Sequence, residues 1–194
     1  MKISNGSLTD VIWRFSQNYL QAYQQQFPHL PIIEQDDEWL SPCEQGIFQK
    51  DYSLWQPVLI DEKLNFDNVE SALDISLHNT IKEYFTSIYC DSLDSSCGEG
   101  NLSLLFAWNK DDFSRLQENI IGHILMKTKL KQKITIFFAV TDNEDHIISV
   151  DNESGEVWVE KIGCEPHKKI ADTLAEFIEQ LSPRIPPSEA NELM

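Results

Sequence analysis

The sequence predicts an α+β fold, with a mainly antiparallel sheet flanked by helices, in a single domain over residues 1–183 followed by a polar tail, 184–194. Three observations lead to this prediction. A chain of 194 residues is most simply one domain, and 41% hydrophobic residues, with five Trp and ten Phe, can fill a sizeable core. In the expected order of elements, strands do not alternate regularly with helices, which disfavours a doubly wound sheet.

The chain is expected to open with a helix. Apolar residues three and four positions apart predict it over Ser7–Gln26. Ser7 or Thr9 can serve as its N-cap, and Pro28 ends it. An acidic connection that contains proline follows as far as Pro42, and proline interrupts backbone pairing there.

Two short strands and a second helix are expected next. The strands are Ile47–Tyr52 and Leu54–Leu59, and Pro57 indicates an edge position or the end of the second strand. A long, regular apolar period predicts a single helix over Asp67–Ile88. The Ser-, Asp- and Gly-rich segment Asp91–Gly100 is expected to be a loop.

A strand, a helix and a further strand are expected in the middle of the chain. The strands are Leu102–Trp108 and Ile134–Val140. Asp111 and Asp112 open the third helix, because carboxylates favour a helix N-terminus. A basic cluster at its C-terminal end is expected to complement the helix dipole, or alternatively to form a minor patch for phosphates or acidic lipid. The cluster consists of Lys127, Lys129, Lys131 and Lys133.

The sequence of the last part of the domain predicts a hairpin followed by a helix. Ile147–Val150 and Val157–Val159 flank a turn that ends in Ser154-Gly155, which is typical of a β-hairpin. An amphipathic pattern then predicts a helix over Lys169–Leu181.

Acidic residues outnumber basic ones by 32 to 15, which gives a formal net charge of −17. Residues 1–109 hold 16 of the acids and only 5 of the bases. Nucleic acids and anionic lipids attract Lys and Arg, so this balance disfavours binding to either. Like charges gathered on one surface repel each other and oppose compaction, so the sequence predicts a basic partner.

No pattern predicts a catalytic site, a metal site or a cofactor. Cys43 lies beside Glu44, whose negative charge disfavours a thiolate. The spacing of Cys90 and Cys97 does not match the usual zinc sites. The chain has neither a calcium-loop pattern nor a glycine-rich phosphate loop. His123, within the third helix, is expected to be a packed, hydrogen-bonded residue.

The chain is expected to be a soluble cytosolic protein. Its first residues lack the apolar run of a signal peptide, and no stretch approaches the ~18 apolar residues of a membrane span. The four cysteines form no Cys-x-x-Cys pair, so reduced thiols are expected.

Six segments, in a set order over nearly the whole chain, carry a family resemblance. The longest is residues 111–123, DDFSRLQENIIGH. The others are Ser41–Cys43, Trp55–Pro57, Ile148–Val150, Ser154–Val157 and Leu174–Phe177. Together they resemble the Syd family, the SecY-interacting proteins of Gram-negative bacteria. The resemblance runs from the first helix to about Pro183.

The resemblance implies an α+β domain, distantly related to the SMI1/KNR4 group, with a concave and negatively charged surface. It implies binding to the basic cytosolic loops of SecY, the channel subunit of the protein-export translocase. It also implies a non-enzymatic role that regulates or proofreads translocase assembly. The protein would then be peripheral at the cytoplasmic side of the bacterial inner membrane, held by SecY and not by lipid, and partly cytosolic.

Nine acidic residues are the candidates for contact with SecY. None lies in a matching segment, so charge alone selects them. Cytoplasmic loops of membrane proteins carry excess Lys and Arg, which makes an acidic surface complementary to them. The candidates are Glu34, Asp36, Asp37, Glu38, Asp61, Glu62, Asp91, Asp94 and Glu99.

Two other classes of function stay open. An immunity-type protein that neutralises a basic nuclease toxin by occupying its cleft would need the same charge. A hydrolase that uses Cys43 or a pair of carboxylates is the other class.

Overall fold

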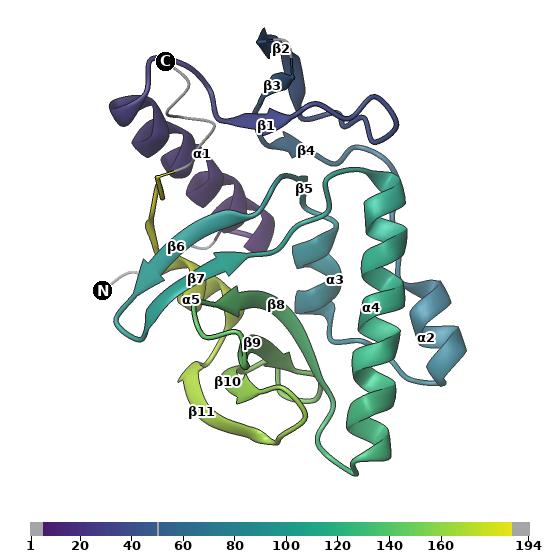
Figure 1. Cartoon of the computed structure of the whole chain (residues 1–194). Helices are drawn as coiled ribbons and strands as arrows, with labels where there is room; N and C mark the ends of the chain where they lie inside the picture. Colours follow the sequence, from purple (N-terminus) through teal and green to yellow (C-terminus); the bar gives the residue numbers. More distant parts are fainter. Residues whose placement is uncertain (1–5, 50, 188–194) are drawn as a thin grey trace.

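Five helices and three sheets make up the described part of the chain, residues 6–49 and 51–187 of this computed structural model (Figure 1). The architecture is α+β with a large antiparallel sheet in a single domain, which confirms the predicted fold class. The helices are α1 (Leu8–Gln26), α2 (Asp67–Leu73), α3 (Asn79–Phe85), α4 (Lys110–Lys129) and α5 (Leu174–Glu179).

The largest sheet has seven strands in the order β11-β10-β9-β8-β7-β6-β12, and all neighbours pair antiparallel. A three-stranded sheet, β1-β3-β2, lies at one end of the molecule (Figure 1), and β4 pairs with β5. The strands are β1 (Ile32–Glu34), β2 (Glu44–Gln49), β3 (Tyr52–Trp55), β4 (Val58–Leu59), β5 (Ile88–Tyr89), β6 (Leu93–Cys97), β7 (Gly100–Leu104), β8 (Thr135–Thr141), β9 (His146–Asp151), β10 (Val157–Lys161), β11 (Pro166–Ala171) and β12 (Ser182–Pro183).

Helices cover both faces of the large sheet. Successive side chains of a strand point to opposite faces, and two neighbours on β8 follow this rule. Phe137 contacts the ring of His123 on α4, at 5.5 Å between ring centres. Phe138 contacts Tyr84 of α3 and Phe177 of α5 on the other face. The core therefore has two layers, one on each side of the sheet.

The first predicted helix is confirmed as α1, with Ser7 as its N-cap. The Ser7 hydroxyl accepts from the backbone N–H of Asp10 at 3.2 Å, and the Asp10 carboxylate accepts from the N–H of Ser7 at 3.0 Å. This capping box satisfies two N–H groups at the start of the helix. The apolar stripe of α1 packs against α3 and α5.

The predicted hairpin is confirmed as β9 and β10. The Asp151 carboxylate accepts from the backbone N–H groups of Glu153 and Ser154, both at 2.9 Å. Gly155 has φ +78°, and a Cβ atom there would lie 2.6 Å from the ring of His78. Both the backbone conformation and the close approach therefore require glycine at this position.

The predicted single helix Asp67–Ile88 is wrong, because two helices and a strand occupy this range. Asp74 has φ 51° in the left-handed region, and α2 ends there. His78 then caps α3 with its side chain. The backbone N–H of His78 donates to the Asn152 side chain at 2.9 Å. This contact with the β9–β10 turn stabilises the non-helical backbone between α2 and α3.

The segment Asp91–Gly100 was expected to be a loop, and this prediction is wrong. It contains β6, which pairs with β7 on one side and β12 on the other. Ser95, a residue that favours loops, is fully buried and donates its hydroxyl to a carbonyl of the same strand at 3.0 Å. The predicted strand Leu102–Trp108 is also too long at its end, since β7 stops at Leu104.

The predicted strands Ile47–Tyr52 and Leu54–Leu59 correspond to three short strands, β2, β3 and β4. Pro57, which cannot donate to a ladder, separates β3 from β4 and so marks the end of a strand as expected. The connection before them, expected to lack pairing, contains β1, which pairs with β3. The predicted strand Ile134–Val140 is confirmed as β8 within one residue at each end.

The last helix is shorter than the predicted Lys169–Leu181. Residues up to Ala171 pair with β10 as β11, and α5 begins only at Leu174. The Thr173 side chain caps it by accepting from a backbone N–H at 3.2 Å. The domain boundary after residue 183 stays a prediction, and residues 188–194 of the predicted tail lie outside the described residues.

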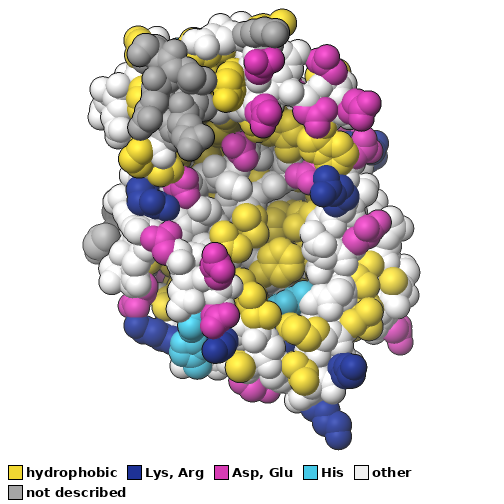
Figure 2. Space-filling model, viewed as in Figure 1, with side chains coloured by type: hydrophobic (Ala, Val, Ile, Leu, Met, Phe, Trp, Pro, Cys, Tyr) yellow, Lys and Arg dark blue, Asp and Glu magenta, His cyan; other side chains and the backbone are white. Residues whose placement is uncertain are grey.

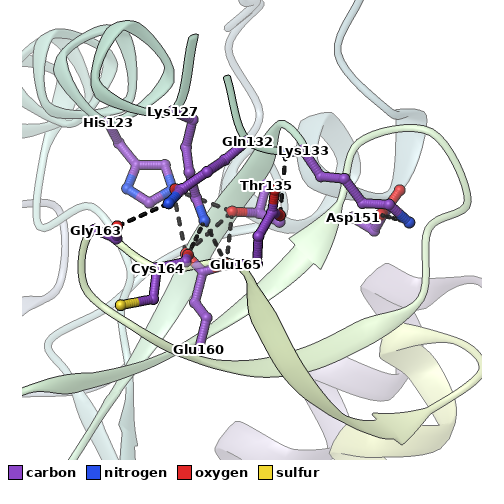
Figure 3. Close-up of polar contacts among 10 residues, drawn as sticks. All are labelled: His123, Lys127, Gln132, Lys133, Thr135, Asp151, Glu160, Gly163, Cys164 and Glu165. Carbon is purple, nitrogen blue, oxygen red and sulfur yellow. Dashed lines mark hydrogen bonds and ion pairs between the residues drawn. The ribbon is translucent and has the colours of Figure 1, made fainter. Parts of the chain in front are cut away.

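A buried ion pair fixes the C-terminal end of α4 to the sheet (Figure 3). Lys127 belongs to the basic cluster expected at the helix C-terminus, and it is fully buried, because it follows Ile120 and Ile124 on the apolar face of the helix. Its ammonium donates to Glu160 Oε2 at 3.0 Å and to the carbonyl of Cys164 at 2.7 Å. These hydrogen bonds offset the cost of removing both charges from water.

Thr135 and His123 complete this buried cluster (Figure 3). The Thr135 hydroxyl donates to Glu160, at 2.9 Å from the nearer oxygen. His123 Nε2 lies 3.2 Å from the Thr135 hydroxyl, which confirms a packed, hydrogen-bonded histidine. Burial, together with the Lys127 ammonium, lowers the pKa of His123 to about 4. The ring is therefore neutral at pH 7.

Replacing Lys127 by Ala should lower the free energy of unfolding by about 3–5 kcal/mol, because the Glu160 carboxylate would stay buried without its cation. Lys129→Ala, at an exposed position of the same helix end, should change it by less than about 0.5 kcal/mol. Urea denaturation followed by circular dichroism measures both values. Small and equal effects of the two substitutions would contradict a stabilising role for the buried pair.

The pH dependence of stability should carry a contribution from His123. The unfolded chain binds a proton at a pKa of about 6.5, whereas the folded protein does not until about pH 4, so folding becomes less favourable as the pH falls between these values. His123→Asn should flatten this part of the profile, measured as the difference in unfolding free energy between pH 7 and pH 4.5. A variant profile that runs parallel to the wild-type profile would rule this contribution out.

Candidate functional site

The start of α4 holds the acidic segment 34–42 against the body of the protein. Asn109, the N-cap of α4, accepts from the backbone N–H of Asp112 at 2.8 Å through Oδ1. Its Nδ2 donates to the carbonyl of Leu40 at 2.9 Å. The Asn109 side chain therefore accepts a hydrogen bond from a free N–H group at the helix start and also fixes the acidic segment.

Two further contacts fix the same segment. The Ser41 hydroxyl donates to the backbone carbonyl of Trp108. The Arg115 guanidinium lies 5.0 Å from the centre of the Trp39 ring, within the range of a cation–π interaction. The segment is thus attached to α4 on both sides of Leu40.

A depression of about 350 Å³ opens between this segment, the loop after β4 and the first turn of α4. Four carboxylates are among its lining residues, on Asp37, Glu38, Glu62 and Asp111. Lys110 is the one cation in that lining. We call this feature the acidic depression.

Glu62 is already engaged within the protein. The Tyr89 hydroxyl donates to it at 2.8 Å, and the Lys110 ammonium lies 3.1 Å away. These two contacts lower the pKa of Glu62. Its carboxylate is ionised at neutral pH, and Lys110 already neutralises part of this charge before any partner binds.

Asp36, Asp37 and Glu38 are exposed and make only local hydrogen bonds. Asp36 accepts from the backbone N–H of Glu38 at 2.9 Å, and Asp37 accepts from the Gln35 amide at 2.8 Å. Within residues 6–49 and 51–187, no Lys or Arg forms an ion pair with these three carboxylates. Their charges are therefore available to a basic partner.

The other predicted acidic residues lie elsewhere. Glu34 and Asp61 are exposed, at the end of β1 and in the loop after β4. Asp91 and Asp94 line a separate cavity, and Glu99, in the β6–β7 turn, pairs with a lysine of β11. The nine residues thus do not share one depression, and their assignment to one contact surface stays a prediction.

Figure 2 shows acidic side chains concentrated toward the end of the molecule that carries the three-stranded sheet, around apolar side chains at the centre of the same face. Three large apolar residues of this part of the chain are also exposed. Leu40, Ile47 and Leu59 have 62%, 69% and 47% of their surface accessible. The surface therefore offers apolar contact beside its carboxylates.

Cys43, the cysteine considered as a nucleophile, does not lie in an activating environment. Cys43 is fully buried, and burial raises the pKa of its thiol to about 11, so little thiolate exists at pH 7. In the part of the chain that the structure describes, no group of three or more His, Cys, Asp or Glu side chains could hold a metal ion. The described helices include none with the length and apolar character needed to cross a bilayer.

Sequence reasoning did not select Asp111 for the acidic depression. The only signal was the pair Asp111-Asp112, which indicated a helix start. Its proximity to Glu38 depends on the hydrogen bond between Asn109 and Leu40, which joins residues 69 positions apart. No local pattern encodes such a contact.

Comparison with known proteins finds relatives along nearly the whole chain. The family model described as Syd protein (SUKH-2) matches residues 9–183. Protein Syd of Colwellia psychrerythraea is 56% identical over 191 residues, covering 94% of this chain and 96% of the relative. Protein Syd of Shewanella frigidimarina is 42% identical over 182 residues, covering 90% and 82%. That of Pseudoalteromonas atlantica is 36% identical over 182 residues, covering 92% and 95%.

Replacing Asn109 by Ala should release the acidic segment as well as uncap α4. Loss of an N-cap costs about 1 kcal/mol of stability, and the lost bond to Leu40 should speed amide hydrogen exchange across residues 36–41. Ser7→Ala is the matched control, because it removes the N-cap of α1 far from this segment in the sequence. Exchange across 36–41 that rises equally in both variants would contradict a specific role of Asn109.

Proposed function

Since this chain belongs to the Syd family, we propose that it is a non-enzymatic protein that binds SecY and regulates or proofreads the assembly of the translocase. In this proposal the acidic depression and the adjoining carboxylates of Asp36, Asp37 and Glu38 meet basic cytosolic loops of SecY. The observation that carries it is the set of exposed carboxylates on segment 34–42, which lack internal cations among the described residues.

Charge complementarity supports a loop of a membrane protein as the partner. Cytoplasmic loops near a membrane carry excess Lys and Arg, whereas this chain has a net charge of −17. Charged groups of opposite sign steer the encounter and suppress wrong partners more than they add affinity. With a screening length of ~8 Å at physiological salt, binding should weaken as salt rises.

The attachment of the acidic segment supports binding without a large rearrangement. Segment 34–42 is held at Leu40 by Asn109 and at Trp39 by Arg115, so its carboxylates are presented on a fixed backbone. Ordering a flexible segment on binding would cost free energy. The exposed side chain of Leu40 adds an apolar contact for the stems of Lys and Arg residues.

The proposed location follows from the proposed partner. The same negative charge that suits basic loops disfavours adsorption to anionic lipid. The protein would therefore be peripheral at the cytoplasmic side of the inner membrane, held there by SecY, and partly cytosolic when unbound.

Changing Asp36, Asp37 and Glu38 together to Lys should weaken binding to SecY at least about tenfold, because the partner's cations would meet like charges. Surface plasmon resonance with SecY in nanodiscs measures the affinity. The matched control changes the exposed residues Glu118, Glu144 and Glu153 to Lys, which alters the net charge equally. Circular dichroism checks that both variants are folded.

Equal loss of binding in both triple variants would show that only net charge matters and would contradict the proposed surface.

Purification of the chain with its bound partners distinguishes the proposal from the immunity-type alternative. Recovery of a basic toxin without SecY would favour that alternative over the proposal.

A further inference from the structure

A second cavity, of about 150 Å³, combines aromatic and acidic side chains. Tyr19 and Tyr23 of α1 and Trp55 of β3 are among its lining residues, together with Asp91 and Asp94. The three aromatic residues are each less than one-tenth exposed. Aromatic faces beside carboxylates attract organic cations, because the ring quadrupole and the negative charge act in the same direction.

Tyr19 is one of the polar side chains in the lining of this cavity. The residue is 6% exposed, and none of the side-chain hydrogen bonds among the described residues includes its hydroxyl. Burial, together with the nearby carboxylates of Asp94 and Asp91, raises the pKa of Tyr19. The hydroxyl can therefore form a hydrogen bond with a polar ligand that enters the cavity.

The two carboxylates of the cavity differ in their partners. Asp94 accepts from the Ser103 hydroxyl and lies 3.3 Å from the Arg184 guanidinium, so its charge is compensated. Asp91 accepts only from the adjacent backbone N–H of Ser92, at 2.7 Å. No ion pair of the described residues includes Asp91, and burial raises its pKa. The cavity therefore holds one carboxylate that lacks a cation.

We propose that this cavity binds the cationic side chain of an arginine or lysine carried by a basic partner segment. The proposal rests on the proposed function and adds to it a defined subsite, apart from the acidic depression. The Asp91 carboxylate accepts a charged hydrogen bond from the ligand, and the Tyr19 hydroxyl accepts another N–H. Trp55, in the same lining, adds an aromatic contact for the cation. The acidic depression attracts the partner, whereas this cavity selects one side chain of it.

Titration with single amino-acid derivatives tests the subsite directly. The probes are N-acetyl-arginine amide and N-acetyl-lysine amide, and N-acetyl-citrulline amide is the uncharged analogue of the arginine probe. The signal is the indole N–H of Trp55 in the ¹⁵N-labelled full chain. At least one cationic probe should shift this signal in a saturable way, whereas the citrulline probe should not.

Asp91→Asn and Tyr19→Phe, which preserve shape, should each weaken binding of the cationic probe about tenfold, as expected for loss of a charged hydrogen bond. Glu118→Gln, at an exposed site of α4, is the control and should leave binding unchanged. No saturable shift with either cationic probe, an equal shift with citrulline, or unchanged affinity in both variants would overturn the proposal. If SecY is still captured in that case, the subsite fails and the proposed function stands.

Discussion

The buried ion pair between Lys127 and Glu160 is the constraint on which the arrangement of the surface depends. It joins the last turn of α4 to β10 without access to water, and the Thr135 hydroxyl extends it to β8. Because α4 is one continuous helix, fixing its C-terminal end also limits where its first turn can lie. The first turn in turn holds the acidic segment through Asn109. The buried ion pair and the proposed binding surface thus lie at opposite ends of α4.

The acidic residues have different roles once their contacts are known. Glu62 and Asp94 have internal cations and help to build the fold, whereas Asp36, Asp37 and Glu38 face solvent without one in the described chain. Counting charges alone cannot make this distinction. These three carboxylates lie on a segment that contacts with α4 and its N-cap hold in place, which suits recognition of a basic chain by a preformed surface.

Local patterns predicted the parts of the fold that local interactions determine. The helix α1 could be predicted from the spacing of its apolar residues and its capping serine, and the β9–β10 hairpin from its turn residues. The break at Asp74 was missed, because it depends on contact between His78 and a turn 74 residues later. The burial of Lys127 was missed for the same reason, since its partner Glu160 lies on a strand 33 residues away in the sequence. The charge imbalance predicted an acidic surface, but long-range contacts decide which carboxylates are free.

The most direct test of the proposed surface is site-specific photo-crosslinking in cells. A photo-reactive amino acid replaces Leu40, which is exposed in the lining of the acidic depression, and in a second strain it replaces Ile162, which is 51% exposed after β10. Mass spectrometry then identifies the crosslinked peptide. We expect a Lys- and Arg-rich cytosolic segment of SecY to crosslink to position 40 and none to position 162. Crosslinks to SecY from position 162 alone would contradict it.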